Sequence, residues 1–173
     1  MKTVLVTGPI GSGKSEVCRY LRSKGYPVYD CDSGTKKLYD AVPGLKSRIE
    51  ESLDIKWSEI GIIFTDSDRR EKLERMVYPL VVRDICEWKA GLDSGLAFIE
   101  SAIAMDKHEF DRLYDEVLMV TADRQIRNDR NPKAAQRDAL QTFDLSRVTY
   151  IIENDSTLED LYKKTDKILC RLI

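Results

Sequence analysis

The stretch Lys2 to Ser15, KTVLVTGPIGSGKS, decides the fold. An apolar run of strand type, Lys2 to Thr7, leads directly into a segment that satisfies G-x-x-x-x-G-K-[ST], and a helix is expected to begin at Ser12 or Gly13. Strand, glycine-rich turn and helix in this order are the context that a phosphate-binding loop requires, because backbone N–H groups and the helix N-terminus then face the phosphate oxygens. The stretch therefore predicts a site for a nucleoside triphosphate.

Separate roles are expected within this loop. Lys14 should reach the β- and γ-phosphates, and the hydroxyl of Ser15 should ligate magnesium. The alternative is a glycine-rich turn whose lysine is only a solvated surface charge, which the strand–turn–helix context disfavours. The residues that let the backbone turn tightly and keep its N–H groups clear are Gly8, Gly11 and Gly13.

Further apolar runs follow the loop along the chain. They alternate with longer segments of helical period, which is the pattern of a parallel sheet flanked by helices. The predicted fold class is therefore α/β, with a five-stranded parallel sheet of the P-loop type. The first helix should carry Val17, Cys18 and Leu21 inward and stop at Gly25. The strands are expected at Lys2 to Thr7, Pro27 to Asp30, Leu96 to Glu100, Glu116 to Thr121 and Val148 to Glu153.

Two helical segments interrupt the alternation. No strand pattern lies between Ser33 and Asp93, where leucines and isoleucines recur at helical spacing, so a helical insertion is expected at about 33–93. A mobile helical lid at about 124–143 is expected from basic residues, the start signal Pro132 and few bulky apolar residues. We therefore expect a single domain over 1–173, closed by a last helix from Thr157 to Leu172.

Composition and charge narrow the class of protein. With 42% hydrophobic and 34% charged residues, the 173-residue chain is that of a globular protein, and its net charge of −2 argues against broad binding to nucleic acid or anionic membranes. The four cysteines form no metal-ligand spacing, so reduced and mostly buried thiols are expected. No apolar run approaches the roughly 20 residues of a membrane span. Cytoplasmic location is therefore the expectation.

The loop establishes nucleotide binding more firmly than it establishes chemistry, because many classes of protein use it. The chain has no N-K-x-D motif for guanine and is short for a motor domain. A kinase for a small metabolite is therefore the leading hypothesis. A nucleotide-binding regulator without turnover stays open.

Acidic residues follow two of the expected strands. If the backbone stays extended, Asp30 and Asp32 project to the same face at the carboxyl edge of the sheet, where an Asp can accept the proton of an acceptor hydroxyl. The alternative is that either one caps a helix beginning near Thr35. Glu100 ends the third expected strand, where it can hold magnesium-bound water or orient the acceptor; otherwise it is a solvated strand-end charge.

These segments together resemble the dephospho-CoA kinase family, which reads strand, G-G-I-G-S-G-K, helix and D-A-D. The matching residues here are the loop, a helix ending in Lys24-Gly25, and Asp30-Cys31-Asp32. Pro9 replaces the family's second glycine, Glu100 stands where Asp is usual, and Ser101 to Met105 replaces a P-L-L-F-E-like acceptor segment. Shorter similarities lie at Asp68-Arg69 with Leu73, Val77-Tyr78-Pro79, Arg127, Arg130, Arg137 with Gln141, and Ile151 to Asn154.

The resemblance implies a shortened and divergent member that uses ATP and Mg²⁺ to phosphorylate the ribose 3′-hydroxyl of dephospho-CoA. Asp32 would be the catalytic base, Lys14 and Arg137 would act with it, and Asp30 and Glu100 would also contact the acceptor. Arg127, Arg130 and Arg137 would be lid arginines that close over the phosphates. The nucleotide-binding residues it implies are Gly8, Ile10, Gly11, Ser12, Gly13, Lys14, Ser15, Glu16, Arg130 and Asn154.

Another acceptor on the same scaffold is the first alternative: a nucleoside, a nucleoside monophosphate or a small hydroxy acid. ATP and a small-molecule acceptor are the expected partners, without nucleic acid or membrane.

Overall fold

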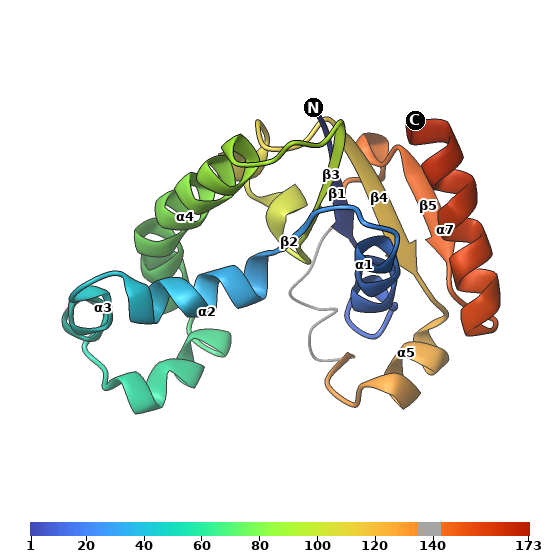
Figure 1. The fold of residues 1–173 in the computed structure, drawn as a ribbon. Coiled ribbons are helices and arrows are strands. Elements are labelled where there is room, and N and C mark those ends of the chain that lie inside the picture. The colour runs from blue at the N-terminus through green and yellow to red at the C-terminus, as the bar shows by residue number, and fades with distance from the viewer. Residues whose placement is uncertain (135–142) are drawn as a thin grey trace. The chain divides into compact units, whose positions relative to one another are not determined.

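The computed structural model describes residues 1–134 and 143–173. Five parallel strands form one sheet in the order β2-β3-β1-β4-β5 (Figure 1), which confirms the predicted α/β fold. The strands are β1 (Lys2–Thr7), β2 (Val28–Asp30), β3 (Leu96–Glu100), β4 (Glu116–Thr121) and β5 (Tyr150–Glu153).

Two of these strands begin slightly later than their apolar runs predict. Pro27 has no N–H to donate, so only its carbonyl takes part, accepting the N–H of Phe98 at 2.9 Å, and β2 begins at Val28. Before β5, Leu145–Arg147 form a short 3₁₀ turn, η4, and the ladder begins at Tyr150. The other three strands have the predicted bounds.

The chain divides into two compact units, a sheet unit made of Met1–Asp30 with Gly91–Ile173 and a helical unit made of Cys31–Ala90. The sheet unit carries the helices α1 (Lys14–Ser23), α5 (Arg124–Arg130) and α7 (Leu158–Leu172). Figure 1 shows α7 running beside β5, and its residues Leu161 and Leu169 join Val17 and Leu21 of α1 in one buried cluster over the sheet.

Alternation along the strands decides which residues reach that cluster. Val4 and Val6 of β1 belong to it together with Phe98, Val120 and Ile152 of the other strands, each fully or almost fully buried. Their strand neighbours point to the opposite face of the sheet, because successive side chains alternate. At roughly 1.5–3 kcal/mol for each large apolar side chain, this burial fixes the register that aligns the carboxyl ends of the strands.

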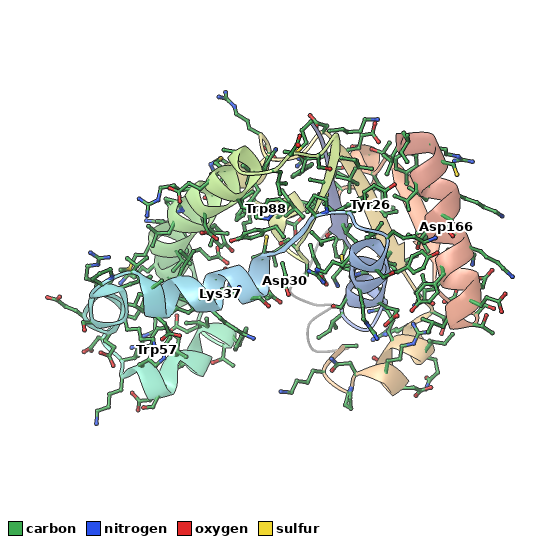
Figure 2. The ribbon with its side chains drawn as sticks, in the orientation of Figure 1. Tyr26, Asp30, Lys37, Trp57, Trp88 and Asp166 are labelled. Carbon is green, nitrogen blue, oxygen red and sulfur yellow. The ribbon has the colours of Figure 1, made fainter. Side chains whose placement is uncertain are left out.

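The helical unit consists of α2 (Cys31–Ala41), α3 (Leu45–Leu53), the 3₁₀ helix η1 (Trp57–Phe64) and α4 (Ser67–Ala90). The helical spacing predicted from the sequence is confirmed here. Trp57, labelled in Figure 2, packs edge-on against Tyr39 with ring centroids 4.8 Å apart, as expected for an aromatic residue with a packing role. The apolar core of the helical unit includes Leu38, Leu45, Ile49, Leu53, Leu73, Val77, Val81 and Ile85.

The expected extended path through Asp30 and Asp32 is wrong. β2 ends at Asp30 and α2 begins at Cys31, so Asp32 lies in the first turn of a helix. Cys31, Gly34 and Leu38 are the buried residues of α2, and this helical spacing starts at the first residue after the strand. The helix that was expected near Thr35 begins at Cys31 instead, directly after Asp30, so the predicted start is wrong, while the alternative that Asp30 caps the helix stays open.

The expectation of mostly buried thiols is wrong for half of the cysteines. Cys18 and Cys31 are buried, whereas Cys86 and Cys170 are exposed, and all four are free. Burial, and next the charge of Glu100, raise the pKa of the Cys18 thiol well above its usual value. Within the described ranges, no helix is both long and apolar enough to cross a membrane.

Candidate active site

The loop between β1 and α1 is pressed against three other segments of the sheet unit. Gly8, Gly11 and Gly13 have φ angles of 136°, 77° and 101°, a region that favours glycine. A Cβ atom at Gly8 would lie 1.9 Å from the carbonyl oxygen of Val120, and one at Gly11 would lie 2.7 Å from that of Arg127. At Gly13 it would lie 2.3 Å from Nδ2 of Asn154. Both the backbone conformation and the space therefore require glycine.

Side-chain donors hold three consecutive carbonyls of the loop. Arg127 Nη1 donates to the Ile10 oxygen at 3.4 Å, Arg130 Nη1 donates to the Gly11 oxygen at 3.3 Å, and Asn154 Nδ2 donates to the Ser12 oxygen at 2.8 Å. The C=O and N–H groups of one planar peptide unit point in opposite directions. Each carbonyl that a donor holds therefore turns the N–H of the next residue away from that donor. The N–H of Ser12 donates to the Pro9 carbonyl at 3.2 Å, and the neighbouring N–H groups of Gly11 and Gly13 are of the kind that binds anions.

Arg127 lies elsewhere than predicted. It was expected among lid arginines closing over the phosphates, but its side chain is buried and its Nε donates to the carbonyl of Ala122 at 3.1 Å. It therefore supports the loop from within the protein. Arg130 also bridges two segments, since its Nη2 donates to the Asn154 carbonyl at 3.1 Å.

The first turn of α1 carries the reactive polar side chains. Lys14 lies back over the loop, with Nζ donating to the carbonyls of Gly8 at 2.8 Å and Pro9 at 3.2 Å. Ser15 Oγ donates to Oε1 of Glu100 at 2.7 Å. Glu100 is only 9% exposed, so the interpretation of a solvated strand-end charge is wrong. The hydroxyl of Ser12 is fully buried and has no hydrogen-bond partner among the described residues.

Two carboxylates lie on neighbouring strands at this edge of the sheet. Asp30 of β2 is in register with Glu100 of β3, which is in turn in register with Val6 of β1. Figure 2 labels Asp30 where β2 ends. Residues in register on adjacent strands project to the same side of the sheet. Both carboxylates therefore lie on the same side of the sheet, at the edge next to the loop.

The remaining predicted residues fall in three places. Glu16 follows Ser15 on α1, where it pairs with Arg19 and accepts the hydroxyl hydrogen of Tyr162 on α7. Asp32 belongs to the helical unit, and its role stays a prediction. Arg137 and Gln141 lie outside the described residues, so the role of Arg137 also stays a prediction.

Sequence reasoning missed the aromatic contact that holds α7 against α1. The rings of Tyr20 and Tyr162 stack with centroids 4.1 Å apart and planes 7° apart. The Tyr20 hydroxyl donates to Asp166 at 2.8 Å, a residue labelled on α7 in Figure 2. The only sequence signal for this contact is that Tyr162 and Asp166 are four residues apart and therefore share a helix face.

This arrangement suits a triphosphate and a hydroxyl acceptor. Loop N–H groups, a helix N-terminus and Lys14 supply positive potential for phosphates. Ser15 and Glu100 supply hard oxygen atoms, and the adjacent carboxylates can orient a hydroxyl group or accept its proton.

No protein-family model matches the sequence. Among curated proteins, a dephospho-CoA kinase of Porphyromonas gingivalis is 37% identical over 139 residues, covering 75% of this chain and 68% of that protein. A dephospho-CoA kinase of Thermus thermophilus is 29% identical over 96% of this chain and 90% of its own length.

Solved structures give the same picture of the whole chain. The crystal structure of TT1252 from Thermus thermophilus matches with a TM-score of 0.82 and 28% identity over 99% of this chain and 98% of that one. A dephospho-CoA kinase from Campylobacter jejuni matches with a TM-score of 0.67 over the same shares at 18% identity, a likeness of fold. With the fold, the phosphate-binding loop and a relative of 37% identity in agreement, the chain belongs to the dephospho-CoA kinase family.

Proposed function

We propose that this protein transfers the γ-phosphoryl group of ATP to the ribose 3′-hydroxyl of dephospho-CoA, which yields coenzyme A and ADP. The observation that carries the donor half is the glycine loop, whose three carbonyls are held by Arg127, Arg130 and Asn154. Membership of the family supports the acceptor half.

The proposed reaction is one in-line displacement. The 3′-oxygen of the acceptor forms a bond to the γ-phosphorus while the bond from that phosphorus to the β–γ bridging oxygen breaks, and ADP leaves with the electron pair. The hydroxyl proton passes to a carboxylate, for which we propose Asp32. Positioning and charge stabilisation supply most of the catalysis, because the loose transition state needs little covalent help.

Lys14 is proposed to offset the negative charge on the β- and γ-phosphates. Its Nζ lies within hydrogen-bond distance of two loop carbonyls, which keeps the positive charge beside the loop where the phosphates are proposed to bind.

Magnesium fits the pair formed by Ser15 and Glu100. Their oxygens are 2.7 Å apart, and magnesium prefers oxygen ligands from one or two side chains together with phosphates and water. We propose that Ser15 ligates the ion directly and Glu100 holds its water. When bound, the ion would neutralise part of the phosphate charge.

On the acceptor side, Asp30 and Glu100 are proposed to orient the ribose by accepting hydrogen bonds from its hydroxyls. Their register on adjacent strands supports this role, since both serve the edge of the sheet where ligands of open α/β sheets bind. Arg130 and Arg137 are proposed to offset charge on the transferring group. We also propose a cytoplasmic location, supported by the four free cysteines.

An acceptor panel tests the proposal. Purified protein with ATP and magnesium would receive dephospho-CoA, AMP, adenosine, uridine or shikimate at equal concentration, and ADP release and product mass would be measured. We expect ADP release above background only with dephospho-CoA, with one phosphate added at the 3′-oxygen. The matched control is Lys14→Ala, which should release no ADP with any acceptor.

Two results would contradict the proposal in different ways. Efficient turnover of another acceptor would leave the kinase assignment intact but show that dephospho-CoA is not the substrate. ATP binding without turnover of any acceptor would point to a regulator.

A further inference from the structure

The stacked rings of Tyr20 and Tyr162 carry two hydroxyl groups, and each hydroxyl reaches an acid on the opposite helix. Tyr20 on α1 donates to Asp166 of α7 at 2.8 Å. Tyr162 on α7 donates to Glu16 of α1. Within each helix the acid and the tyrosine are four residues apart, so they share a helix face. The two contacts therefore form a reciprocal pair between the same two helices.

The two acids of this pair lie at opposite ends of α1. Asp166 is beside Lys24, the C-cap residue of α1, with Nζ and Oδ1 3.4 Å apart. Glu16 lies in the first turn of α1, directly after Ser15, and its N–H donates to the Gly13 carbonyl at 3.1 Å. Of the two acids, Glu16 is therefore the one at the helix end where the phosphates are proposed to bind.

A carboxylate at this end of a helix has two opposite effects. Without a ligand it complements the positive potential of the helix N-terminus. Beside a bound triphosphate it is unfavourable, because like charges a few ångströms apart repel each other. The side chain of Glu16 is only 16% exposed, so solvent screens its charge less than that of a surface residue. The direction in which this carboxylate points therefore matters for nucleotide binding.

The first turn of α1 sends three consecutive side chains to three different places. Lys14 Nζ lies over carbonyls of the loop, and Ser15 Oγ donates to the carboxylate at the end of β3. Glu16 turns towards α7, where its Oε1 accepts the hydroxyl hydrogen of Tyr162. Its Oε2 pairs with Arg19, one turn further along α1. Both oxygens of this carboxylate are thus engaged by partners outside the loop.

We propose that Tyr162 is a positioning residue of the phosphate-binding loop: its hydroxyl holds the Glu16 carboxylate against α7 and so keeps this negative charge off the phosphates. The inference rests on the proposed function, in which ATP binds at the loop. Tyr162 is the fixed partner, because its ring is stacked on Tyr20 with planes 7° apart, whereas the side chain of Arg19 is 74% exposed. The side chain of Glu16 would then be kept from the nucleotide instead of contacting it.

Direct titration with MgATP, without an acceptor, tests the inference. Tyr162→Phe keeps the ring and its stack but removes the hydroxyl. It should raise the Kd of ATP about fivefold, the scale for a unit charge that moves a few ångströms closer at a partly exposed site. Glu16→Gln removes the charge and should lower this Kd about twofold. The double variant should bind ATP as Glu16→Gln does, because the hydroxyl then has no charge to hold away.

Tyr20→Phe is the matched control, since it removes the other hydroxyl of the same stack and leaves Glu16 with its partners. Both tyrosine variants should lower the thermal unfolding midpoint by similar amounts, because each loses one hydrogen bond to a carboxylate. The Kd of ATP should rise in Tyr162→Phe alone. This rise should shrink between about 0.1 M and about 1 M salt, as the Debye length falls from about 10 Å to about 3 Å.

The other possible results would overturn the inference. An unchanged Kd in Tyr162→Phe, or an equal rise in Tyr20→Phe, would mean that the Tyr162 hydroxyl only supports the packing of α7. A rise that persists when Glu16→Gln is also present would mean that the effect does not pass through the carboxylate. Weaker binding by Glu16→Gln alone would mean that this side chain contacts the bound nucleotide or its magnesium.

The titration also separates this inference from the proposed reaction. ATP binding is measured without an acceptor, so a failure to phosphorylate dephospho-CoA would contradict the proposed reaction and leave the result for Tyr162 standing. If the unaltered protein did not bind ATP, both the proposed donor and the positioning role of Tyr162 would be overturned.

Discussion

Two parts of the sheet edge are built in different ways: the glycine loop with its supports, which we propose as the donor side, and the ends of β2 and β3, which we propose as the acceptor side. On the donor side, backbone groups form the site, glycines stand where a Cβ would collide with Val120, Arg127 or Asn154, and three carbonyls are held in place. On the side proposed for the acceptor, side chains are proposed to form the site, namely the carboxylates of Asp30 and Glu100 at the ends of β2 and β3.

This difference explains where the chain departs from the family pattern. A site made of backbone tolerates little change, because almost any side chain at Gly8, Gly11 or Gly13 would strain it. Pro9 is tolerated there because its carbonyl, which every residue has, makes the contacts to Ser12 N–H and Lys14. A site made of side chains can change one contact at a time, and Glu100, where the family usually has Asp, ends β3 on the side proposed for the acceptor.

The largest effect is expected from removing Lys14, the side chain proposed to offset the charge of the phosphates. Lys14→Ala should lower kcat about 1000-fold, the upper range for losing a positioned electrostatic group, while the unfolding midpoint stays unchanged. Steady-state kinetics and thermal unfolding would measure both. Lys163→Ala, which removes a lysine paired only on the surface of α7, is the matched control. Normal turnover of Lys14→Ala would contradict the proposal that the glycine loop binds the phosphate donor.

A smaller effect is expected from the carboxylate proposed as base. Asp32→Asn should lower kcat about 100-fold with the ATP KM unchanged, because the amide keeps the shape but cannot accept the proton. Asp30→Asn is the comparison variant and should affect the acceptor KM more than kcat. The opposite ranking of the two variants would make Asp30 the base.

A third effect should be confined to the donor side. Asn154→Ala leaves the Ser12 carbonyl without its donor in a buried place, a loss of about 1–3 kcal/mol, so we expect the ATP KM to rise about tenfold. The acceptor KM should not change. Gln125→Ala removes an exposed amide from α5 and serves as the control. Equal changes of both KM values would mean that the two sides are not independent.

The smallest effect concerns Cys18, whose thiol is buried under α1 and is influenced by the charge of Glu100. Burial raises the pKa of the Cys18 thiol in the folded protein. As the pH rises above about 8.5, the thiol therefore loses its proton in the unfolded chain before it does so in the folded one. The free energy of unfolding then falls with rising pH. Urea unfolding should give a lower stability at pH 10 than at pH 7.5.

Cys18→Ala should show a weaker dependence of stability on pH over this range. Thiol labelling of the native protein should modify Cys86 and Cys170 first. Rapid labelling of Cys18 would contradict its burial.

The fold was predictable because its signals are local. The five apolar runs, the glycine motif and the left-handed Gly25 after α1 are each decided within a few residues. The start of α2 at Cys31 was not predictable, because Asp30-Cys31-Asp32 fits both an extended and a helical path, and the buried face of the helical unit decides between them.

The supports of the site were less predictable still. Arg127 was expected among the lid arginines and Asn154 as a contact of the nucleotide, yet the first donates to the Ile10 carbonyl from 117 residues away and the second to the Ser12 carbonyl from 142 residues away. Such pairings depend on which strands become neighbours, and no local pattern contains that information.

The hydrogen bond between Asn154 and Ser12 also determines when, during synthesis of the chain, the glycine loop gains its last support. The two residues are 142 positions apart, which at about 5–20 residues per second is a delay of roughly 7–28 s on the ribosome. During that time the glycine loop has been made but lacks its last support, which comes with the residue after β5. If the loop binds ATP as proposed, a nascent chain gains less stability from the nucleotide until β5 has emerged, and ATP then favours chains that have completed their sheet.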